Sequence, residues 1–582
     1  MVAQVQPEQS LVSQIRIKVG AQEVSPEVIR DLTHAVIESS VHLPDMAVLE
    51  FGNSGMQWCR AKIPLFQMGQ ELRIDLGEGN YRREVFVGET ASLELDLDDE
   101  GKTPLRIRAY DRAHRLHRGR FTRSFTNVKD SDIAKSIAAE LELNADVKET
   151  REVHEYLLQN NQTNWEFLHE RATRLGFELQ VRGNTLVLRP PPSTPAEVID
   201  LSWEPAPGRQ GGQLYSLRAR MTTSEQANEV EVRGWDPLNK KEVVGRATSP
   251  EDAPTTGQKK TGGDVAKEAF KRKVRVVIAR EPIYSQDQAE RLAQSVLNEL
   301  GSTFVMIEGA AMGDPRLRLG SEVNLPTLSD QFGGKYVVTE ARHLYDASRY
   351  QIEFKVTGRR STDVVSLLAP SAPPQTHVLT GLVTNNKDPR EVGRVKVKMP
   401  LLGQDIESHW CRVVAPGAGP ERGLEYLPEV DDEVLLVGHD INHLFVLGGL
   451  WNLRDGPPHE NSQAISGGRV TKRVIRSRSG HVIALDDSDG GGSITIVDST
   501  EKNKIVIDTA KNSLAINAQG NIKLEAGGSL EIVAGQDIKI EASTSLKAEA
   551  GTSASVEAKG GNLDLKGTAQ ANLKGMQVNI GQ

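Results

Sequence analysis

Residues 513–558 read SLAINAQGNIKLEAGGSLEIVAGQDIKIEASTSLKAEAGTSASVEA and repeat every eight residues. In each repeat two mostly apolar positions flank one intervening residue, an alanine follows two positions later, and glycine recurs after it. Successive side chains of an extended chain point to opposite faces, so each repeat is predicted to be a short strand that ends in a tight bend. The apolar columns that we expect to face inward contain Leu514, Ile516, Ile522, Leu524, Leu530, Ile532, Ile538, Ile540, Leu546 and Val556.

The length of the repeat indicates how many chains share this structure. Eight residues span at most about 27 Å, and roughly five of them remain for a flat face once the bend is removed. One chain cannot close a three-faced turn with so few residues. Three chains that wind together can, because each supplies one face of every turn. Residues 491–582, which we call the needle, are therefore predicted to form an intertwined trimeric β-helix, and the chain to be a homotrimer.

An antiparallel meander of short strands is the alternative structure for the same repeat. It would place the apolar columns on one face of a flat sheet with open edges, and such a sheet promotes aggregation. The trimeric β-helix avoids this hazard, because its apolar columns meet on a shared axis. We therefore expect the trimer.

The two ends of the needle are predicted to differ. Residues 456–490 precede it and are expected to form a neck. The inward residues become smaller toward the C-terminal end, which predicts a tapering shaft. The repeat loosens after residue 560, and a blunt apolar platform is predicted from Met576, Val578 and Ile580.

The first 370 residues have the alternation of half-buried strands, as in ELRIDLG at 71–77, and predict two β-barrel-like parts. Between these parts, from about residue 111 to 190, the apolar period changes to that of helices. Thr163 and Glu166 form a capping box, and Gly176 follows the last apolar position. This segment is therefore predicted to be a small α/β insertion that contains a helix.

A proline-rich stretch, APSAPPQTH at 369–377, predicts the next domain boundary. Five short strand-like runs follow within residues 377–455, and their number and length fit an OB-fold barrel. The expected fold class is therefore mainly β. It combines β-barrels, a small α/β insertion, an OB-fold barrel and a C-terminal intertwined trimeric β-helix.

Composition excludes several classes of function. The 582 residues carry a formal net charge of −9, which disfavours nucleic acid as a partner. Seven arginines lie between Arg106 and Arg123, but apolar residues alternate with the first of them, so we expect a solvated or interface-lining surface rather than a basic arm. No long apolar run or signal segment is present, so assembly in the cytoplasm is expected. Cys59 and Cys411 are expected to be packed thiols.

No catalytic, cofactor-binding or metal-binding site is predicted. Asp486, Asp487 and Asp489 could supply two catalytic carboxylates or a calcium loop, but no bidentate glutamate follows at the required interval, and an acidic turn explains them better. The histidines lack the spacing of metal ligands. The competing function is a phage tail spike that binds or cleaves surface glycans. That function would need aromatic sugar platforms, and the sequence after Trp451 has no aromatic residue.

Several segments resemble the VgrG family and the fused hub and spike of contractile phage tails. NWEFLHERATRLGFEL at 164–179 and VRGWDP at 232–237 resemble the family's hub signatures, and GRVKVKMPLL at 393–402 and FVLGGLWN at 445–452 resemble its OB module. The order of these segments, followed by the octapeptide repeat, is specific. The opening, at 14–46, most resembles spikes of extracellular phage-tail-like injection particles.

The resemblance implies a structural role. Residues 1–370 would form a trimeric hub that caps the inner tube and contacts baseplate proteins, and the OB module would narrow the axis. The needle would puncture the target cell envelope, with transient membrane contact, and its platform would carry a PAAR-like tip protein. No effector or lysozyme-like domain is recognised, so the chain is expected to be no enzyme. It would belong to a contractile injection particle that is assembled in the cytoplasm and can be released outside the cell.

Overall fold

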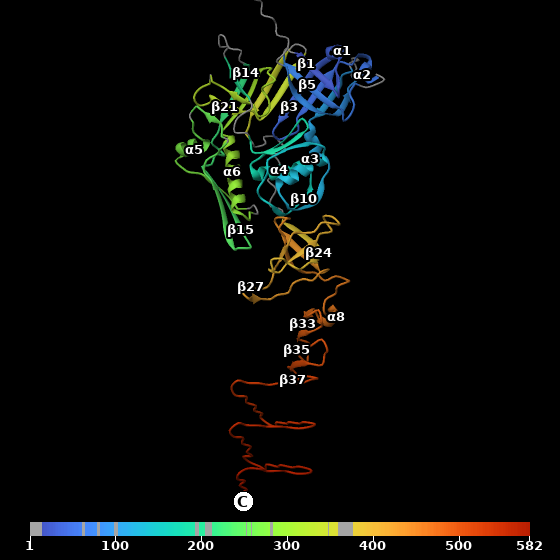
Figure 1. The fold of residues 1–582 in the computed structure, drawn as a ribbon, viewed down its shortest axis with the longest axis vertical. Coiled ribbons are helices and arrows are strands. Elements are labelled where there is room, and N and C mark those ends of the chain that lie inside the picture. Colours follow the sequence, from blue (N-terminus) through green and yellow to red (C-terminus); the bar gives the residue numbers. More distant parts are fainter. Residues whose placement is uncertain are drawn as a thin grey trace, which may run out of the picture. The chain divides into compact units, whose positions relative to one another are not determined.

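The computed structural model shows a mainly β chain with two compact units, Met1–Leu453 and Arg454–Gln582 (Figure 1). Most of the predicted boundary segment 369–377 lies outside the described residues. Among the described residues, no helix has the length and apolar composition that a membrane crossing requires. The structure describes residues 14–60, 65–77, 82–97, 103–191, 197–203, 212–251, 253–257, 259–279, 283–326, 328–346, 349–358 and 376–581.

A single fifteen-stranded sheet organises the first unit. Its N-terminal half and its later half meet where β22 pairs antiparallel with β3, with His343 opposite Ile37. The two predicted β-barrel-like parts therefore share one continuous sheet, and each half has its own apolar core. The strands are β1 (Gln14–Val19), β2 (Gln22–Glu23), β3 (Leu32–Ser40), β4 (Met46–Phe51), β5 (Glu71–Gly77), β6 (Arg83–Leu95), β7 (Leu105–Tyr110), β13 (Val198–Ser202), β14 (Gly212–Met221), β17 (Thr255–Thr256), β19 (Val305–Met312), β20 (Glu322–Asn324), β21 (Gly334–Val337), β22 (Glu340–Asp346) and β23 (Tyr350–Val356).

The α/β insertion lies between β7 and β13, within the predicted range. Its helix α4 (Asn164–Leu175) begins with the predicted capping box, in which the Thr163 hydroxyl accepts from the Glu166 amide and the Glu166 carboxylate accepts from the Thr163 amide. Gly176 ends the helix in the left-handed conformation, with φ 69°. The other elements are a 3₁₀ turn (Arg112–His117), β8 (Phe121–Val128), α3 (Asp130–Glu140), β9 (Asn144–Val147), β10 (His154–Gln162), β11 (Glu178–Arg182) and β12 (Thr185–Arg189).

A second insertion into the large sheet, between β14 and β19, consists mainly of a long helix packed on a three-stranded sheet; we call it the second excursion. Helix α6 (Gln286–Ser302) covers one face of this sheet, as the green helix and strands of Figure 1 show. Gly245 allows the close approach, because a Cβ at this position would lie 2.1 Å from the carbonyl carbon of Ala289 in α6. The other elements are β15 (Glu229–Asp236), β16 (Lys241–Ala247), α5 (Gly262–Phe270) and β18 (Arg275–Ile278).

The predicted OB module is a closed five-stranded barrel. Its core includes Val395, Cys411 and Val446, and the Cys411 thiol is buried as predicted. The side chain of Cys59 lies outside the described residues. The barrel closes in the order β24 (His377–Asn385), β25 (Arg394–Lys398), β26 (Cys411–Val413), β30 (Phe445–Gly449) and β29 (Glu433–Gly438).

In the second unit, α8 (Asn461–Ala464), β31 (Ile465–Ser466) and β32 (Arg469–Val470) precede an antiparallel meander that crosses the predicted start of the needle at residue 491. Its strands β34, β35 and β36 begin eleven residues apart, and the connections between them are long enough for the chain to reverse. The later repeats are eight residues long, and the structure assigns no strand to residues 518–581. The sheet pairs β33 (Lys472–Arg476), β34 (Val482–Asp486), β35 (Ser493–Val497), β36 (Lys504–Asp508) and β37 (Ser513–Asn517) in chain order.

Replacing Gly245 with alanine is expected to separate β16 from α6 and to destabilise the first unit by about 1–3 kcal/mol, because the added methyl group would overlap the helix backbone. The measurement is the thermal unfolding midpoint of the full chain. Gly417→Ala is the matched control, because no heavy atom lies within 4 Å of a Cβ at that position. Equal midpoints for the G245A and G417A variants would contradict the packing described here.

Candidate functional site

The predicted inward columns are exposed to solvent in the single chain. Leu514 and Ile516 lie on β37, and the other column residues lie in 518–581. Their exposed fractions range from 55% for Ile516 to 76% for Val556. Large apolar side chains are seldom left exposed in such a continuous series unless another surface covers them. The exposed columns therefore mark a surface for association.

Ion pairs place the charged residues of the repeat on one face of the extended chain. Lys539 Nζ lies 2.6 Å from a carboxylate oxygen of Glu541, and Lys523 pairs with Glu525 in the same way. Residues two positions apart share a face of an extended chain, so the intervening Ile540 points to the opposite face. The structure thus separates a charged face from an apolar face, as the sequence pattern predicts.

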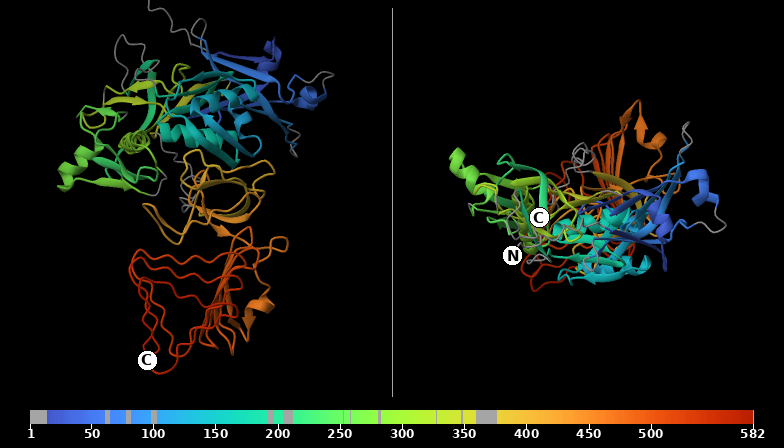
Figure 2. Two further views of the ribbon diagram at one scale, coloured as in Figure 1. Left: turned by 60° about the horizontal axis from the view of Figure 1, so that its bottom comes forward. Right: turned by 90° about the horizontal axis from the view of Figure 1, so that it is seen from above.

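The backbone of residues 518–581 pairs with no other backbone within the part of the chain that the structure describes; only the Gln519 amide has a partner, the side-chain oxygen of Asn503 at 3.0 Å. No backbone–backbone hydrogen bond joins these residues to one another or to the rest of the described chain. In Figure 2 this red stretch winds through successive straight segments and sharp corners. Extended peptide groups normally bond to a neighbouring strand or to water. This stretch is therefore free to pair with strands from elsewhere.

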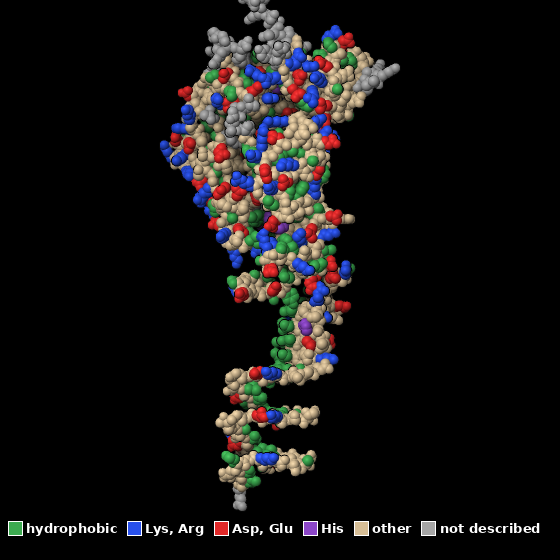
Figure 3. Space-filling model, viewed as in Figure 1, with side chains coloured by type: hydrophobic (Ala, Val, Ile, Leu, Met, Phe, Trp, Pro, Cys, Tyr) green, Lys and Arg blue, Asp and Glu red, His purple; other side chains and the backbone are tan. Residues whose placement is uncertain are grey.

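The meander exposes an apolar ladder that leads into the needle columns. The register places Ile483 opposite Ile496, and Ile505 opposite Ile516. In a second row of side chains beside the first, Ile494 lies opposite Ile507. Figure 3 shows hydrophobic side chains gathered in a stripe at the level of β33 to β37. The whole ladder consists of Ile475, Ile483, Leu485, Ile494, Ile496, Ile505, Ile507, Leu514 and Ile516, and every member is exposed.

The predicted platform residues share one face at the end of the chain. Met576, Val578 and Ile580 alternate with polar residues, and all three are exposed. The side-chain amide of Gln577 donates through Nε2 to Asn579 Oδ1 at 3.1 Å, so the polar residues lie together on the other face. The structure brings no other apolar element against the platform within the described residues.

The candidate chemical groups have local structural roles. Asp486 accepts hydrogen bonds from the amide and hydroxyl of Ser488, which lower the pKa of its carboxyl group. Asp487 pairs with Arg473 at 2.6 Å. These contacts form the predicted acidic turn after β34. Among the described residues, no group of three or more His, Cys, Asp or Glu side chains is arranged to hold a metal ion.

The arginine-rich window is neutralised within the chain. Six of its seven arginines form ion pairs. Glu89 accepts from Arg112 at 3.1 Å and from Arg115, and it lies 3.0 Å from His114. Burial raises the pKa of Glu89, but the hydrogen bonds from Arg115, His114 and Arg112 outweigh this effect and lower it to about 2. In β7 the buried Leu105, Ile107 and Ala109 alternate with half-buried residues, which confirms the strand-like alternation, and an interface-lining role for the window stays a prediction.

Comparison with known families identifies the first unit. Residues 14–346, more than half of the chain, match the family described as the Alg8 N-terminal domain. The chain belongs to this family. Residues 379–451 match a second family, the type VI secretion system/phage-baseplate injector OB domain. This match confirms the predicted OB module and, with it, the predicted resemblance to the hub and spike of contractile injection systems.

Solved structures show distant likeness in fold. The 43 kDa tail protein of prophage MuSo2 from Shewanella oneidensis is 14% identical, with 59% of this chain and 98% of that chain covered and a TM-score of 0.45. A tail protein from Neisseria meningitidis is 13% identical, with 60% of this chain and 96% of that chain covered and a TM-score of 0.43. The E. coli c3393 protein, a type VI secretion system component, is 14% identical, with 75% of this chain and 99% of that chain covered and a TM-score of 0.43. No curated protein matches. The assignment rests on the two family matches.

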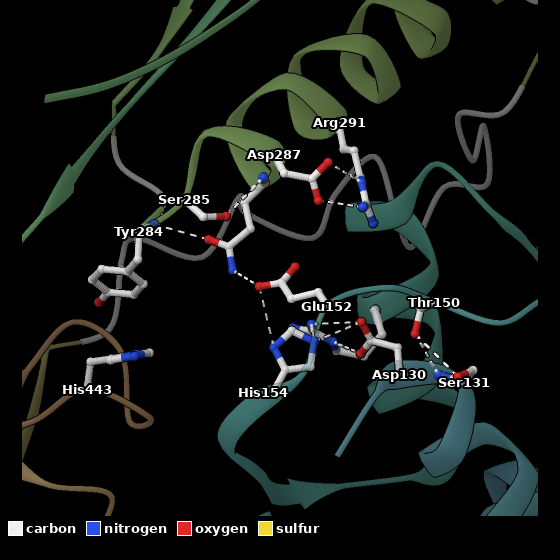
Figure 4. A network of polar contacts seen from close by, with 12 residues as sticks. Asp130, Ser131, Thr150, Glu152, His154, Tyr284, Ser285, Asp287, Arg291 and His443 are labelled. Carbon is white, nitrogen blue, oxygen red and sulfur yellow. Dashed lines mark hydrogen bonds and ion pairs between the residues drawn. The ribbon is translucent and has the colours of Figure 1, made fainter. Parts of the chain in front are cut away.

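A buried ionic network fixes the α/β insertion of the Alg8 N-terminal domain (Figure 4). Asp130, at the start of α3, accepts from Arg171 Nε at 2.6 Å, and His154 Nε2 lies 2.9 Å from the same carboxylate. Glu152 accepts from Gln288 of α6, so the network also joins the insertion to the second excursion. Burial raises the pKa of Asp130, but the hydrogen bond from His154 and the charge of Arg171 outweigh it and lower the pKa to about 2.

Sequence reasoning missed this network in the Alg8 N-terminal domain. Asp130 opens a predicted helix, where an acidic residue has an ordinary role beside the helix dipole. Its partner Arg171 lies 41 residues away, and His154 lies on a different strand. The only local signal was that the helix begins with an acid followed by apolar residues. The pairing itself requires the tertiary fold.

Replacing Asp130 with asparagine is expected to destabilise the insertion by about 3 kcal/mol, because the buried Arg171 would lose its charged partner. Asp130 titrates near 4 when unfolded and near 2 when folded, so its contribution is present above about pH 4 and is lost as the pH falls through about 2. D130N should remove that acid-dependent loss. Chemical denaturation across this pH range is the measurement.

Asp146→Asn is the matched control for this prediction. Asp146 pairs with Arg189 on the surface of the same insertion, and its side chain is 53% exposed. Exposed pairs typically contribute less than about 1 kcal/mol, so D146N should unfold nearly as the parent chain does. A D130N chain as stable as D146N at every pH would show that the buried network does not hold the insertion.

Proposed function

We propose that this chain is the fused hub and spike of a contractile injection apparatus and acts as a homotrimer without enzymatic activity. The observation that carries the proposal is the state of residues 518–581, which combine an unpaired extended backbone with exposed apolar columns. The match to the injector OB domain supports the same assignment. A stretch of this kind is complete only when other strands cover it.

Identical chains are the best partners for this surface. In a trimer wound around one axis, strands of the other two copies would supply the missing hydrogen bonds, and the column residues would face one another. The apolar ladder of β33 to β37 runs directly into Leu514 and Ile516, so the same three-chain axis would cover both surfaces. One association would therefore bury a continuous apolar stripe from the meander to the end of the repeats.

This arrangement suits a rod that punctures a cell envelope. The rungs would be tied by hydrogen bonds between different chains, so the rod could not open without separating three strands cooperatively. Residues 1–370 would form the hub that caps the inner tube and contacts baseplate proteins, and the OB module would narrow the axis. The platform of Met576, Val578 and Ile580 would hold a PAAR-like tip protein. The particle would assemble in the cytoplasm and could be released to act on a target membrane.

A glycan-directed tail spike is the weaker alternative. Such proteins stack sugars on aromatic side chains, and the chain has none after Trp451. The acidic residues Asp486 and Asp487 are occupied by a turn and by Arg473. No observation favours this function over the spike.

The proposal is tested by two substitutions at neighbouring positions of one repeat. Ile532→Asp would place a charge in the predicted inward column, whereas Val533→Asp would place the same charge on the outward face, where Glu531 already lies. Burying three unpaired carboxylates on one axis is strongly unfavourable. I532D should therefore lose the multimer that resists dissociation in cold SDS, and V533D should keep it.

The comparison controls for hydrophobicity, because both substitutions remove a β-branched apolar residue that is exposed in the single chain. Gel mobility before and after heating separates the assembled and dissociated forms. An I532D chain that keeps its SDS-resistant multimer, or a V533D chain that loses it equally, would contradict the inward and outward faces assigned to the repeat.

A further inference from the structure

The OB barrel is fastened to the α/β insertion by a small contact that we call the barrel joint, formed by Glu155–Leu158 of β10, His409 and the loop 440–443. Tyr156 and Leu158 of β10 are buried within the apolar core of the barrel. The Leu158 amide donates to Asn442 Oδ1 at 2.7 Å, which links two residues 284 positions apart. The joint is therefore a built contact between two folded parts of the first unit.

Two histidines lie at the centre of the barrel joint. The ring of His409 stacks on Tyr156 with centroids 6.1 Å apart, and its Nε2 lies 3.2 Å from Glu155. The ring of His443 lies 6.3 Å from that of His409, in an edge-on arrangement. The ring of Tyr284, which precedes α6, packs on the ring of His443 with centroids 4.1 Å apart, and Figure 4 shows this pair.

The charged groups around His409 make its protonation unfavourable while the joint is closed. Arg394 and Lys396 of β25 and the neighbouring His443 all oppose a further positive charge. Arg394 pairs with Asp388 at 2.6 Å and Lys396 with Glu407 at 2.8 Å, so their opposition is what remains beyond these ion pairs. Glu155 of β10 favours it, but Arg390 already pairs with this carboxylate. Asp440, the other nearby acid, lies 2.8 Å from His443 Nδ1 and accepts from Asn442. The closed joint has therefore little spare negative charge for His409.

We propose that the barrel joint is a pH-sensitive fastening, in which protonation of His409 loosens the OB barrel from the α/β insertion. The proposal concerns contacts within one chain and does not depend on the trimer. An apparatus carrying this joint would hold the barrel firmly at neutral pH and release it in acidic surroundings. The released parts would be the barrel and the α/β insertion that contains β10, each with its own fold intact.

The direction of the effect follows from the pKa of His409. Burial of the ring lowers this pKa to about 4, with contributions from His443, Arg394 and Lys396 that outweigh Glu155. An opened joint would return His409 to its ordinary value of 6.5. The closed joint is therefore fully favoured above about pH 6.5, and it loses stability as the pH falls from 6.5 toward 4, because only the open form binds the proton.

Hydrogen exchange of the full-length chain tests the proposal, after correction for the intrinsic pH dependence of exchange. At about pH 5 the opening equilibrium should be roughly twentyfold more favourable than at about pH 7, given the two pKa values of His409. Protection should fall for peptides that contain Leu158 and for the 440–443 loop. Protection of α3 should not change, because Asp130 remains ionised at this pH.

Two variants separate His409 from other acid-sensitive groups. His409→Gln keeps a polar group that can donate toward Glu155 but cannot take up a proton, so H409Q should keep its protection at both pH values. His34→Gln alters an exposed histidine on β3 and should behave like the parent chain. Equal protection of the parent joint at both pH values would overturn the proposal, and so would an equal loss in H409Q.

The parent chain alone keeps the test decisive if H409Q does not fold. In that case the comparison between the Leu158 peptides and the α3 peptides of the same molecule remains. A selective and reversible loss at the joint supports the proposal. A loss of the same size in both regions would mean general acid unfolding, and the proposal would be wrong.

Discussion

An extended backbone has to find hydrogen-bond partners, and this constraint governs the C-terminal unit. Residues 518–581 alternate charged and apolar faces with a regular period, yet they form no backbone–backbone hydrogen bond in the described part of their own chain. The columns that include Ile532 and Ile540 are exposed along the same stretch. Missing hydrogen bonds and exposed apolar surface are both relieved by one event, the winding of identical strands around a common axis. Because one association would supply both the hydrogen bonds and the burial, the repeat is better explained as part of a trimer than as a free sheet.

The first unit has the opposite character, because its polar and apolar groups are satisfied largely within the chain. The fifteen-stranded sheet pairs its two halves directly through β22 and β3. Buried charges such as Asp130 and Glu89 are matched by arginines, so removing one partner would be costly while the intact pairs are stable. A unit of this kind can fold before assembly, whereas the needle would gain its structure through association.

Features that depend on neighbouring residues could be predicted from the sequence, and features that depend on long-range contacts could not. The capping box of Thr163 and Glu166, and the left-handed Gly176, depend only on neighbouring residues, and the structure confirms them. The OB barrel was predictable because five short strands follow one another closely. The joining of two barrel-like parts into one sheet was not, because β22 and β3 are separated by about half the chain. The contact between Leu158 and Asn442 depends on tertiary packing in the same way.

The predicted start of the needle at residue 491 is a further feature that the sequence pattern could not locate. Apolar alternation continues without interruption from the meander into the octapeptide repeats, so the pattern of Ile505 and Ile507 resembles that of Ile522 and Leu524. The spacing differs, at nine to eleven residues between strand starts in the meander and eight in the repeats. The strands of the meander pair with one another as far as β36 and β37, whereas residues 518–581 form no such pairs within the described chain. Alternation alone predicts extended chain and does not say which strand will be its partner.

The mass of the purified full-length chain in solution tests the central claim most directly. Light scattering coupled to size-exclusion chromatography should give a single species of about 191 kDa, three times the 63.7 kDa of one chain. A species of 63.7 kDa that stays monomeric as its concentration rises would contradict the account, because residues 518–581 would then remain unpaired and uncovered in the functional molecule.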